Sequence, residues 1–501
     1  MTDFFAHHIL SLILLTPALA AGLLFLLPNR VRVLKAFAVA AALIVLGLAV
    51  AVWAGYDAGA AGYQFEERLT WYAAVGSDYH LGVDGLSIPL ILLTALITLL
   101  ALLAAADVPG NMRAFLALFL LLESGMLGVF LSLDLLLFFV FWEAGLVPMY
   151  FLIAQWGGER REGAALKFLL YTMGASLGLL LAVQVIRLAA GSFDLTALAE
   201  SWPALLAGEL FGLPVGAVKA MAFAGMAAAF AVKLPLWPFH TWLPDAHTEA
   251  PTAGSMVLAG VLLKMGGYGF LRLLLPLFPA ESARCAPVLA GLGAAGILFG
   301  ALAAWSQKDL KRLIAYSSVG HMGFVVLGVA AAASLGMGSA AGGLALRGAA
   351  LQMFNHGLSA AGMFLLAGAL QHRAHTRNLE DFGGLWACAP VFGGALILAA
   401  LGSLGLPGLG GFVSELMVIL GVWPAFPLAA VLAAAGLLFT GAYILKVLSK
   451  VLHGALPERW KGAALEIGIR ERLAMAPLIL LMLLTGIWPG WILGLIGTAV
   501  R

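Results

Sequence analysis

The stretch that decides the fold is Lys233-Leu-Pro235-Leu-Trp-Pro238-Phe-His240. It lies inside an apolar run over residues 218–243, which is long enough to cross a membrane. Each proline removes a backbone donor and clashes with the preceding turn, so a continuous helix is not expected here. Unsatisfied backbone groups are costly in hydrocarbon, and such a break persists only where protein or a polar cavity shields it. The stretch therefore predicts a broken transmembrane helix that carries a buried lysine.

The composition of the whole chain predicts a polytopic membrane protein. Of the 501 residues, 63% are hydrophobic and 10% are charged, whereas a soluble domain carries about 25% charged residues. The net charge of +2 excludes a strongly basic surface, so no nucleic acid is expected as a partner. The two cysteines, Cys285 and Cys388, are too few to hold an iron–sulfur cluster or a thiolate zinc site alone. Any redox chemistry that the protein serves is therefore expected elsewhere.

Apolar runs of about 20 residues predict an all-α bundle of about 14 transmembrane helices. The first run has no Lys or Arg before it and continues past a cleavage-like Ala18-Leu19-Ala20, so a retained helix is expected rather than a signal peptide. The expected spans are 8–27, 33–54, 86–106, 113–132, 134–155, 164–190, 218–243, 252–278, 285–305, 310–333, 343–370, 388–423, 426–452 and 473–497.

A second soft stretch, residues 402–411 around Pro407, is expected to break the twelfth span. The two breaks fall in the fourth member of spans 4–8 and in the fourth member of spans 9–13. Because five is an odd number, two such copies would sit inverted to each other, and paired breaks indicate a transporter site. The predicted organisation is three helices with an outer loop (1–112), a first five-helix repeat (113–278), an inverted second repeat (285–452) and a final loop and helix (453–501).

Lys and Arg residues gather in the loops that follow the odd-numbered spans. By the positive-inside rule these loops face the cytoplasm, so both termini are expected on the opposite side of the membrane. The cluster Lys308-Asp309-Leu-Lys311-Arg312 falls on the cytoplasmic side and is interpreted as a topology anchor, with proton uptake or partner contact as the alternative. The long outer segments 55–85 and 191–217 are expected to cap the bundle.

Ionisable side chains inside the spans are the sharpest functional signal, because each one costs several kcal/mol unless it is paired or hydrated. Their spread along the chain suits a lateral proton relay better than one tight catalytic cluster. The series consists of Glu123, Glu143, Lys233, Lys264, His321, His356 and Glu415.

The two lysines are the central members of this series. Glu143 is the expected partner of Lys233, since an opposite charge favours the ionised form of a lysine while burial disfavours it. A lysine held between these two effects can take up and release a proton near neutral pH. Lys264 lies too deep in its span to reach the interface by snorkelling. A structural ion pair is the alternative for each lysine.

His321 and His356 are expected relay members, because the ordinary pKa of histidine, about 6.5, lies near neutral pH. Hydrogen-bonded packing is one alternative, and bis-histidine haem ligation is another, which the neighbouring lysines and glutamates disfavour. Glu415 follows the second break, and this position disfavours a purely structural role for it. Glu123 is equally compatible with a packing role, and His240 either lines an exit path or belongs to a cap.

Four segments resemble the antiporter-like proton-channel subunits of respiratory complex I and their relatives in cation/proton antiporters and membrane-bound hydrogenases. These segments are FWEAGLVPMYFLIAQWG (141–157), VKLPLWPFHTWLPDAHTEAPTAGSMVLAGVLLKMGGYG (232–269), DLKRLIAYSSVGHMGF (309–324) and FNHGLSAAGMFLLAGAL (354–370). The resemblance runs through nearly the whole chain. Glu415 occupies a position where L-like and N-like subunits and antiporters usually carry lysine, and a glutamate there is typical of the M-type branch.

The resemblance implies a role for each charged position. Glu143 corresponds to the coupling glutamate, Lys233 to the central pump lysine and Lys264 to the connecting lysine. The histidines at 321 and 356 correspond to polar-axis residues, and the glutamate at 415 to the distal channel residue. One proton-translocating unit is therefore expected in this chain, driven by quinone reduction in partner subunits.

The resemblance also implies the surroundings of the chain. No cofactor is expected in it, and NADH, FMN, the iron–sulfur clusters and quinone are expected in partner subunits. L-like and N-like subunits are the expected neighbours on either side within the lipid bilayer. The alternatives are a subunit of a sodium/proton antiporter or of a membrane-bound hydrogenase complex. A purely structural membrane scaffold is disfavoured, because a scaffold does not need buried lysines.

Overall fold

The stretch around Lys233 ends a helix, as the sequence predicts. In the computed structural model, which describes residues 7–105 and 110–499, α10 (Val215–Lys233) stops at this lysine and α11 (Trp242–Glu249) begins beyond the prolines. The second predicted break is also present, between α18 (Pro390–Leu404) and α19 (Gly410–Val422). Gly405 and Gly408 have φ values of +79° and +94° there, a conformation that glycine adopts at little steric cost.

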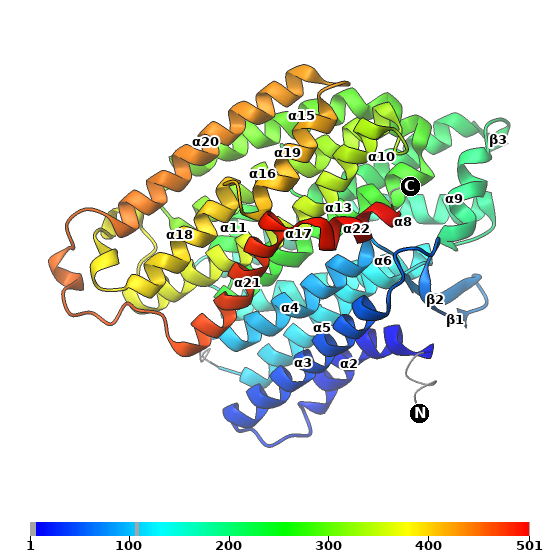
Figure 1. The fold of residues 1–501 in the computed structure, drawn as a ribbon. Coiled ribbons are helices and arrows are strands. Elements are labelled where there is room, and N and C mark those ends of the chain that lie inside the picture. Colours follow the sequence, from blue (N-terminus) through cyan, green and yellow to red (C-terminus); the bar gives the residue numbers. More distant parts are fainter. Residues whose placement is uncertain (1–6, 106–109, 500–501) are drawn as a thin grey trace.

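The other helices form a tilted bundle in which segments from both halves of the chain pack together (Figure 1). The N-terminal half contains α2 (Ile9–Leu23), α3 (Val31–Gly55), α4 (Ser87–Ala104), α5 (Met112–Leu131), α6 (Leu135–Ala144), α7 (Leu146–Trp156), α8 (Arg161–Ala190) and α9 (Leu195–Ala204). The C-terminal half contains α15 (Pro279–Ser306), α16 (Leu310–Leu335), α17 (Ala340–Ala374), α20 (Pro427–Leu452), α21 (Ile469–Ile487) and α22 (Gly490–Ala499). Short 3-10 turns occupy Leu379–Asp381, Leu385–Ala387 and Glu458–Trp460.

The helix lengths establish a predominantly helical, polytopic membrane protein. Within the described residues, 11 helices are long and apolar enough to cross a membrane, or 12 if α21 and α22, which are bent by 75°, form one span. The sequence predicts about 14 spans, and the difference lies in the shorter apolar helices α2, α18 and α19. Residue 106, where the third span was expected to end, and both chain ends, residues 1–6 and 500–501, lie outside the described residues.

The eighth predicted span contains two π-helical segments that no sequence pattern predicts. It consists of α12 (Thr252–Val257), η1 (Leu258–Leu262), α13 (Leu263–Gly269), η2 (Phe270–Leu274) and α14 (Leu275–Leu277). Such segments are rare and frequently lie at functional sites. Here they flank Lys264 on both sides.

Close backbone packing holds this span against α17. A Cβ atom added to Gly357 would lie 2.9 Å from the carbonyl oxygen of Gly260. A larger residue at 357 would push the two helices apart, whereas a Cβ atom added to Gly260 would meet Ile97 of α4 at 2.6 Å. The glycine at 357 therefore lets its neighbour His356 approach the span that carries Lys264.

The boundary between the fourth and fifth predicted spans, around Ser132–Asp134, is confirmed. Oδ1 of Asp134 accepts hydrogen bonds from the backbone amides of Leu136 and Leu137, each at 2.9 Å. This side chain caps the N-terminus of α6. Asp134 therefore begins the fifth span.

The outer segments correct the expectation of an entirely α-helical chain. β1 (Gln64–Tyr72) pairs with β2 (Ser77–Val83) in an antiparallel hairpin, and β3 (Glu209–Leu210) pairs with β4 (Leu213–Pro214). Thr70, Trp71 and Tyr72 are residue types enriched in strands, and Gly76, with φ of +73°, supplies the turn. The composition of the segment thus explains the hairpin, although its outward position alone suggested only a cap.

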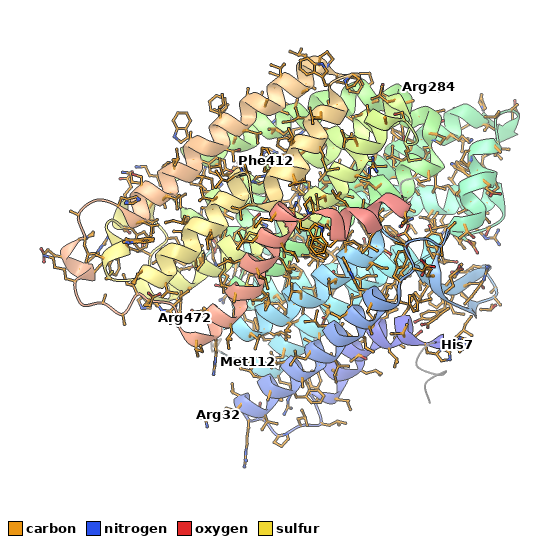
Figure 2. All side chains as sticks on the ribbon, in the orientation of Figure 1. His7, Arg32, Met112, Arg284, Phe412 and Arg472 are labelled. Carbon is orange, nitrogen blue, oxygen red and sulfur yellow. The ribbon has the colours of Figure 1, made fainter. Side chains whose placement is uncertain are left out.

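Figure 2 labels basic side chains at both ends of the bundle. Arg32 and Arg472, which belong to loops expected on the cytoplasmic side, lie toward one end. His7 and Arg284 lie toward the opposite end. The bundle axis thus runs between these two groups of residues.

A buried histidine fastens the hairpin to the rest of the outer face. His80 on β2 is 2% exposed, and its Nε2 lies 3.0 Å from Glu66 Oε2. Its Nδ1 lies 3.4 Å from Asp194 Oδ2, at the N-cap of α9. Arg68 joins the same Asp194 carboxylate at 2.8 Å and Asp78 at 2.8 Å. Burial lowers the pKa of His80, but the two carboxylates outweigh burial and raise its pKa above the ordinary 6.5.

We expect the attachment of this hairpin to weaken as the pH rises. Because the pKa of His80 is raised in the folded protein, its stabilising effect is complete below about pH 6.5 and is lost as the pH rises through the folded value. Amide hydrogen exchange of β2, corrected for intrinsic rates, should be faster at pH 8 than at pH 6. Each unit of pKa difference corresponds to about a tenfold change in the opening equilibrium. The variant His80→Gln should show no such dependence, and equal protection of the unmodified hairpin at both pH values would refute the assignment.

Candidate functional site

The ionisable series inside the spans is buried, with one exception. The relative exposure is 0% for Glu123, 3% for Lys233, 0% for Lys264, 5% for His321, 3% for His356 and 2% for Glu415. The exception, Glu143, is partly exposed. Buried ionisable groups in an apolar bundle require partners or water, so their contacts decide what they can do.

His321 and Glu415 form a direct contact across the second broken span. Nδ1 of His321 on α16 lies 3.0 Å from Oε1 of Glu415 on α19, and its Nε2 lies 3.0 Å from Oγ of Ser403 on α18. Gln352 Nε2 donates a second hydrogen bond, of 3.2 Å, to the same Glu415 oxygen. The break between α18 and α19 therefore lets one imidazole bond to both halves of the span.

Lys264 and His356 form a second direct contact. The Lys264 ammonium lies 2.7 Å from Nδ1 of His356 on α17 and also donates to the carbonyl oxygen of Ala259 in the first π-helical segment. Nε2 of His356 lies 3.1 Å from Oγ of Ser318 on α16. The π-helical turn thus supplies a carbonyl oxygen to the lysine, and the histidine links the lysine to the next helix.

The two histidine rings join these contacts into one buried axis. The ring centroids of His321 and His356 lie 5.3 Å apart, with the planes inclined at 42°. The structure therefore brings together Lys264, the two histidines and Glu415, which lie on four different helices, α13, α16, α17 and α19. The axis runs from the π-helical span to the second broken helix.

Lys233 lies at the end of α10 and faces an aromatic ring. Its Nζ is 5.2 Å from the centroid of the Trp142 ring, within the range of a cation–π interaction. Trp142 Nε1 in turn donates a 3.0 Å hydrogen bond to Ser176 Oγ. In the part of the chain that the structure describes, no carboxylate lies within 4.0 Å of Lys233 Nζ, although the charge of Glu143 still attracts this ammonium.

Glu123 and His240 remain outside these contacts. Neither carboxylate oxygen of Glu123 has a hydrogen-bond partner among the described residues. This residue lies two helical turns before Phe130 and on the same face of α5, and the Phe130 ring packs edge-on against Tyr268 of α13 at 5.2 Å. Glu123 therefore lies on the face of α5 that contacts α13 near Tyr268. His240 is partly exposed at the first break, 6.2 Å from the Tyr316 ring.

Several polar residues of the axis were not singled out from the sequence. Ser414 Oγ donates to Gln352 Oε1 at 2.5 Å, and Asn355 Nδ2 donates to Gly410 O at 2.7 Å, which ties α17 to the start of α19. Ser318 and Ser403 each hold one histidine nitrogen. The signal that could have found them is the unusual density of amide and hydroxyl side chains in otherwise apolar spans.

No metal centre is apparent in these contacts. Among residues 7–105 and 110–499, no group of three or more His, Cys, Asp or Glu side chains could hold a metal ion. The axis instead alternates groups that gain and lose protons with groups that donate and accept hydrogen bonds. Such an arrangement can move protons between neighbouring side chains.

The fold and this axis define a class of membrane ion-translocating subunit, and comparison with known proteins identifies the family. Residues 132–440 match the family described as NADH:quinone oxidoreductase/Mrp antiporter, TM. The chain belongs to this family.

The relatives within the family are more specific. NADH-quinone oxidoreductase subunit M of Rhodobacter capsulatus is 38% identical over 501 residues, which cover 99% of this chain and 96% of the relative. NAD(P)H-quinone oxidoreductase chain 4 1 of Synechococcus sp. (strain JA-3-3Ab) is 44% identical over 89% of this chain and 83% of the relative. These relatives confirm the resemblance to complex I subunits of the M-type branch.

Solved structures agree with this placement. A chain of respiratory complex I from Thermus thermophilus with bound NADH superposes with a TM-score of 0.86 at 31% identity and covers 98% of both chains. A chain of the Mrp complex from Dietzia sp. DQ12-45-1b gives a TM-score of 0.84 at 23% identity, with 99% of this chain and 97% of that chain covered. The second likeness shows the shared fold alone.

Proposed function

We propose that the chain is a membrane-arm subunit of a redox-driven proton pump, the NADH:quinone oxidoreductase, and that it conducts protons along its buried polar axis. The carrying observation is the pair of direct contacts Lys264–His356 and His321–Glu415, whose imidazole rings lie 5.3 Å apart in an apolar bundle. Groups that exchange protons at such distances, directly or through one water, form a relay. The redox step takes place in partner subunits.

Within this relay, Lys233 is the central proton-holding residue and Glu143 controls it. The negative charge of Glu143 favours the protonated lysine, and its neutralisation or displacement favours proton release. Lys264 and the two histidines then connect Lys233 to Glu415, the distal member. Glu123, on α5, and His240, at the first break, are further proton-carrying groups of the same path.

The architecture that supports this function is a bundle of about 14 crossings with two inverted five-helix repeats, residues 113–278 and 285–452. In support, counting α2 and the broken pair α18–α19 as crossings, together with the bent pair α21–α22, gives this number. Each repeat then has its broken helix in the fourth position. Residues 1–112 and 453–501 flank the repeats.

The chain holds no cofactor in this proposal, and NADH, FMN, the iron–sulfur clusters and quinone bind to partner subunits. Its neighbours in the membrane arm are an L-like and an N-like subunit. It lies in the bacterial inner membrane with both termini on the periplasmic side, which is supported by the concentration of Lys and Arg in alternate loops.

An antiporter subunit that works without redox coupling is the second candidate, since the Mrp complex has the same fold. Glu415 in place of lysine and the subunit M relatives favour the redox-driven complex. Membrane-bound hydrogenase subunits are disfavoured on the same grounds.

The proposal is tested with Glu143→Gln in the complete complex. We expect normal assembly but a loss of NADH:quinone turnover of about tenfold or more, because the amide cannot attract the lysine ammonium as a carboxylate does and a positioned proton-transfer group loses its control. Turnover is measured by NADH oxidation in membranes, and assembly by native gel.

Glu159→Gln provides a matched control, because this glutamate is exposed in the loop after α7 and should behave as the unmodified chain. Wild-type turnover and pumping in Glu143→Gln would contradict the proposal. Loss of assembly in Glu143→Gln alone would favour the scaffold alternative.

A further inference from the structure

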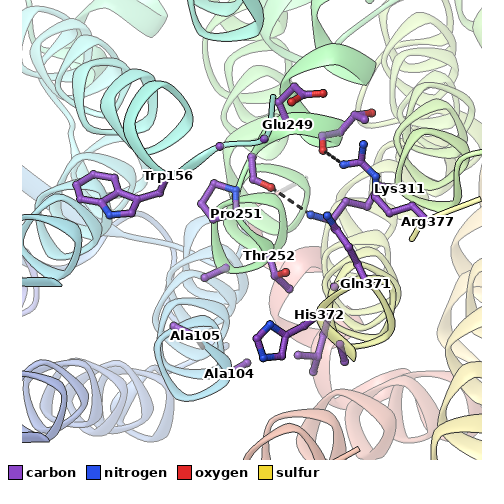
Figure 3. Close-up of a pocket in the computed structure, with 18 of the residues that line it drawn as sticks. Ala104, Ala105, Trp156, Glu249, Pro251, Thr252, Lys311, Gln371, His372 and Arg377 are labelled. Carbon is purple, nitrogen blue, oxygen red and sulfur yellow. Dashed lines mark hydrogen bonds between the residues drawn. The ribbon is translucent and has the colours of Figure 1, made fainter. Parts of the chain in front are cut away.

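A cavity of about 360 Å³ opens at the end of the bundle where the Lys/Arg-rich loops lie. The ends of α4, α7 and α17 and the linker between α11 and α12 line it, as Figure 3 shows for Ala105, Trp156, His372 and the segment from Glu249 to Thr252. A water molecule takes up about 30 Å³ in the liquid, so the cavity has room for roughly ten. Its lining includes the polar side chains of Glu249, Lys311 and Arg377, which can hold water inside the protein.

Most charged groups around this cavity already have partners. Arg377 Nε lies 2.9 Å from Asp309 Oδ2, and the guanidinium also donates to Thr248 O at 2.5 Å. Glu471 pairs with Arg373 at 2.6 Å. These groups hold the wall of the cavity in place.

Lys311 is different from these paired groups. Its side chain is buried, with 3% exposure, and its Nζ donates a 3.2 Å hydrogen bond to the carbonyl oxygen of Ala250 at the cavity wall (Figure 3). Among the described residues no carboxylate lies within 4.0 Å of this ammonium. The charges of Arg377, Asp309 and Glu249 act on it from around the cavity. A buried amine without an ion-pair partner is an expensive group, which is retained at functional positions.

A second buried titratable residue near Lys311 is His247. His247 on α11 is fully buried, and neither of its ring nitrogens has a hydrogen-bond partner among the described residues. Its ring stacks on Phe364 of α17 at 4.5 Å. The charges of both Lys311 and Lys264 act on it. Phe364 lies about two turns beyond His356 on α17, so His247 packs against the helix that carries a histidine of the axis.

We propose that the cavity is the proton-uptake vestibule on the cytoplasmic side and that Lys311 is its proton-accepting residue. The neutral amine takes a proton from hydronium in the vestibule, and the resulting ammonium passes it to the neutral His247 imidazole. Once the Lys264–His356 pair has released a proton toward His321, His247 passes its own proton to that pair and becomes neutral again. The amine of Lys311 is then restored for the next proton. This inference rests on the proposed function, and it gives Lys311 a role in addition to that of a topology anchor.

The first test compares three variants in the complete complex in proteoliposomes. Lys311→Gln should lower NADH-driven pumping by about tenfold to a hundredfold. The upper value is the smallest loss typical of removing a positioned proton-transfer group. Lys311→Arg should lower it similarly, because a guanidinium keeps the charge but cannot be deprotonated. Lys308→Gln is the matched control, since Lys308 has a 72% exposed side chain and should pump normally.

The outcomes separate this inference from the proposed function. Full pumping in Lys311→Arg would show that only the charge is needed and would overturn the assignment of a proton acceptor, as would full pumping in Lys311→Gln. If Lys233→Ala also pumped normally, the proposed function itself would fail. If Lys233→Ala lost pumping while Lys311→Gln pumped fully, the vestibule inference would be rejected and the proposed function would stand.

The second test measures water access independently of activity. In a Cys285→Ser, Cys388→Ser background, Thr252→Cys places a thiol at the cavity and Ser255→Cys places one at a fully buried position nearby. A membrane-impermeant methanethiosulfonate added to the cytoplasmic face of inside-out vesicles should label Thr252→Cys and leave Ser255→Cys unlabelled. Absence of labelling at residue 252 in the assembled complex would show that the cavity is sealed and would refute the vestibule.

Discussion

Replacing Lys233 by alanine should abolish NADH-driven proton pumping and lower NADH:quinone turnover by about a hundredfold or more, the loss expected when a positioned proton-transfer group is removed. Lys233 is 3% exposed and lies at the end of α10, where the chain turns away from helical geometry. Alanine leaves no titratable group there. Pumping is measured by dye quenching in proteoliposomes, and turnover by NADH oxidation in the same preparation.

Lys219→Ala is the matched control for this variant. Lys219 lies on the same helix, is 6% exposed, donates to Pro203 O at 3.2 Å and contacts the Trp202 ring at 5.3 Å. It therefore shares burial and an aromatic contact with Lys233 but lies at the outer end of the helix. Equal losses in the two variants would indicate a general packing defect, and wild-type pumping in Lys233→Ala would remove its proposed role.

Replacing Lys264 by methionine should have an effect of similar size. Methionine has a comparable shape, so the packing of α13 against α17 is preserved, but the contact to His356 Nδ1 and the hydrogen bond to Ala259 O are lost. The relay is then interrupted between the two halves of the chain. We expect turnover and pumping to fall together by about a hundredfold.

A double-variant cycle makes this prediction specific. If Lys264 and His356 act as one unit, the double variant Lys264→Met, His356→Gln should be no slower than the slower single variant, because residues that act together are not additive. Turnover of all four proteins, with assembly checked for each, gives the coupling. Losses that simply multiply would show that the two side chains act independently and would contradict the relay contact.

The sequence was a good guide to where the helices break and which side chains are buried with charge. The prolines after Lys233 and the glycines around Pro407 have backbone consequences that do not depend on distant contacts, so both breaks could be predicted. The burial of Lys264 and Glu415 could be predicted as well, because a charged residue deep in an apolar run faces the interior of the bundle or a hydrated cavity.

The contacts between these residues could not be predicted from the sequence. The pairing of Lys264 with His356 depends on the close approach of Gly260 and Gly357 and on two π-helical segments, and neither has a local sequence signature. Lys311 looked like a member of a surface charge cluster, yet it is buried because the linker after α11 folds over it. Glu143 was expected beside Lys233, but it is partly exposed at the side of the bundle, without an ion pair to this lysine among the described residues.

The most direct test of the relay is the position of ordered water in a high-resolution cryo-EM map of the chain within its complete complex. We predict water molecules that connect Lys233 to Lys264 and that surround the His356–His321–Glu415 contacts, so that each titratable group has a hydrogen-bonded route to the next. Dry, closely packed apolar side chains between Lys233 and Lys264 in every resolved state would contradict proton conduction along this axis.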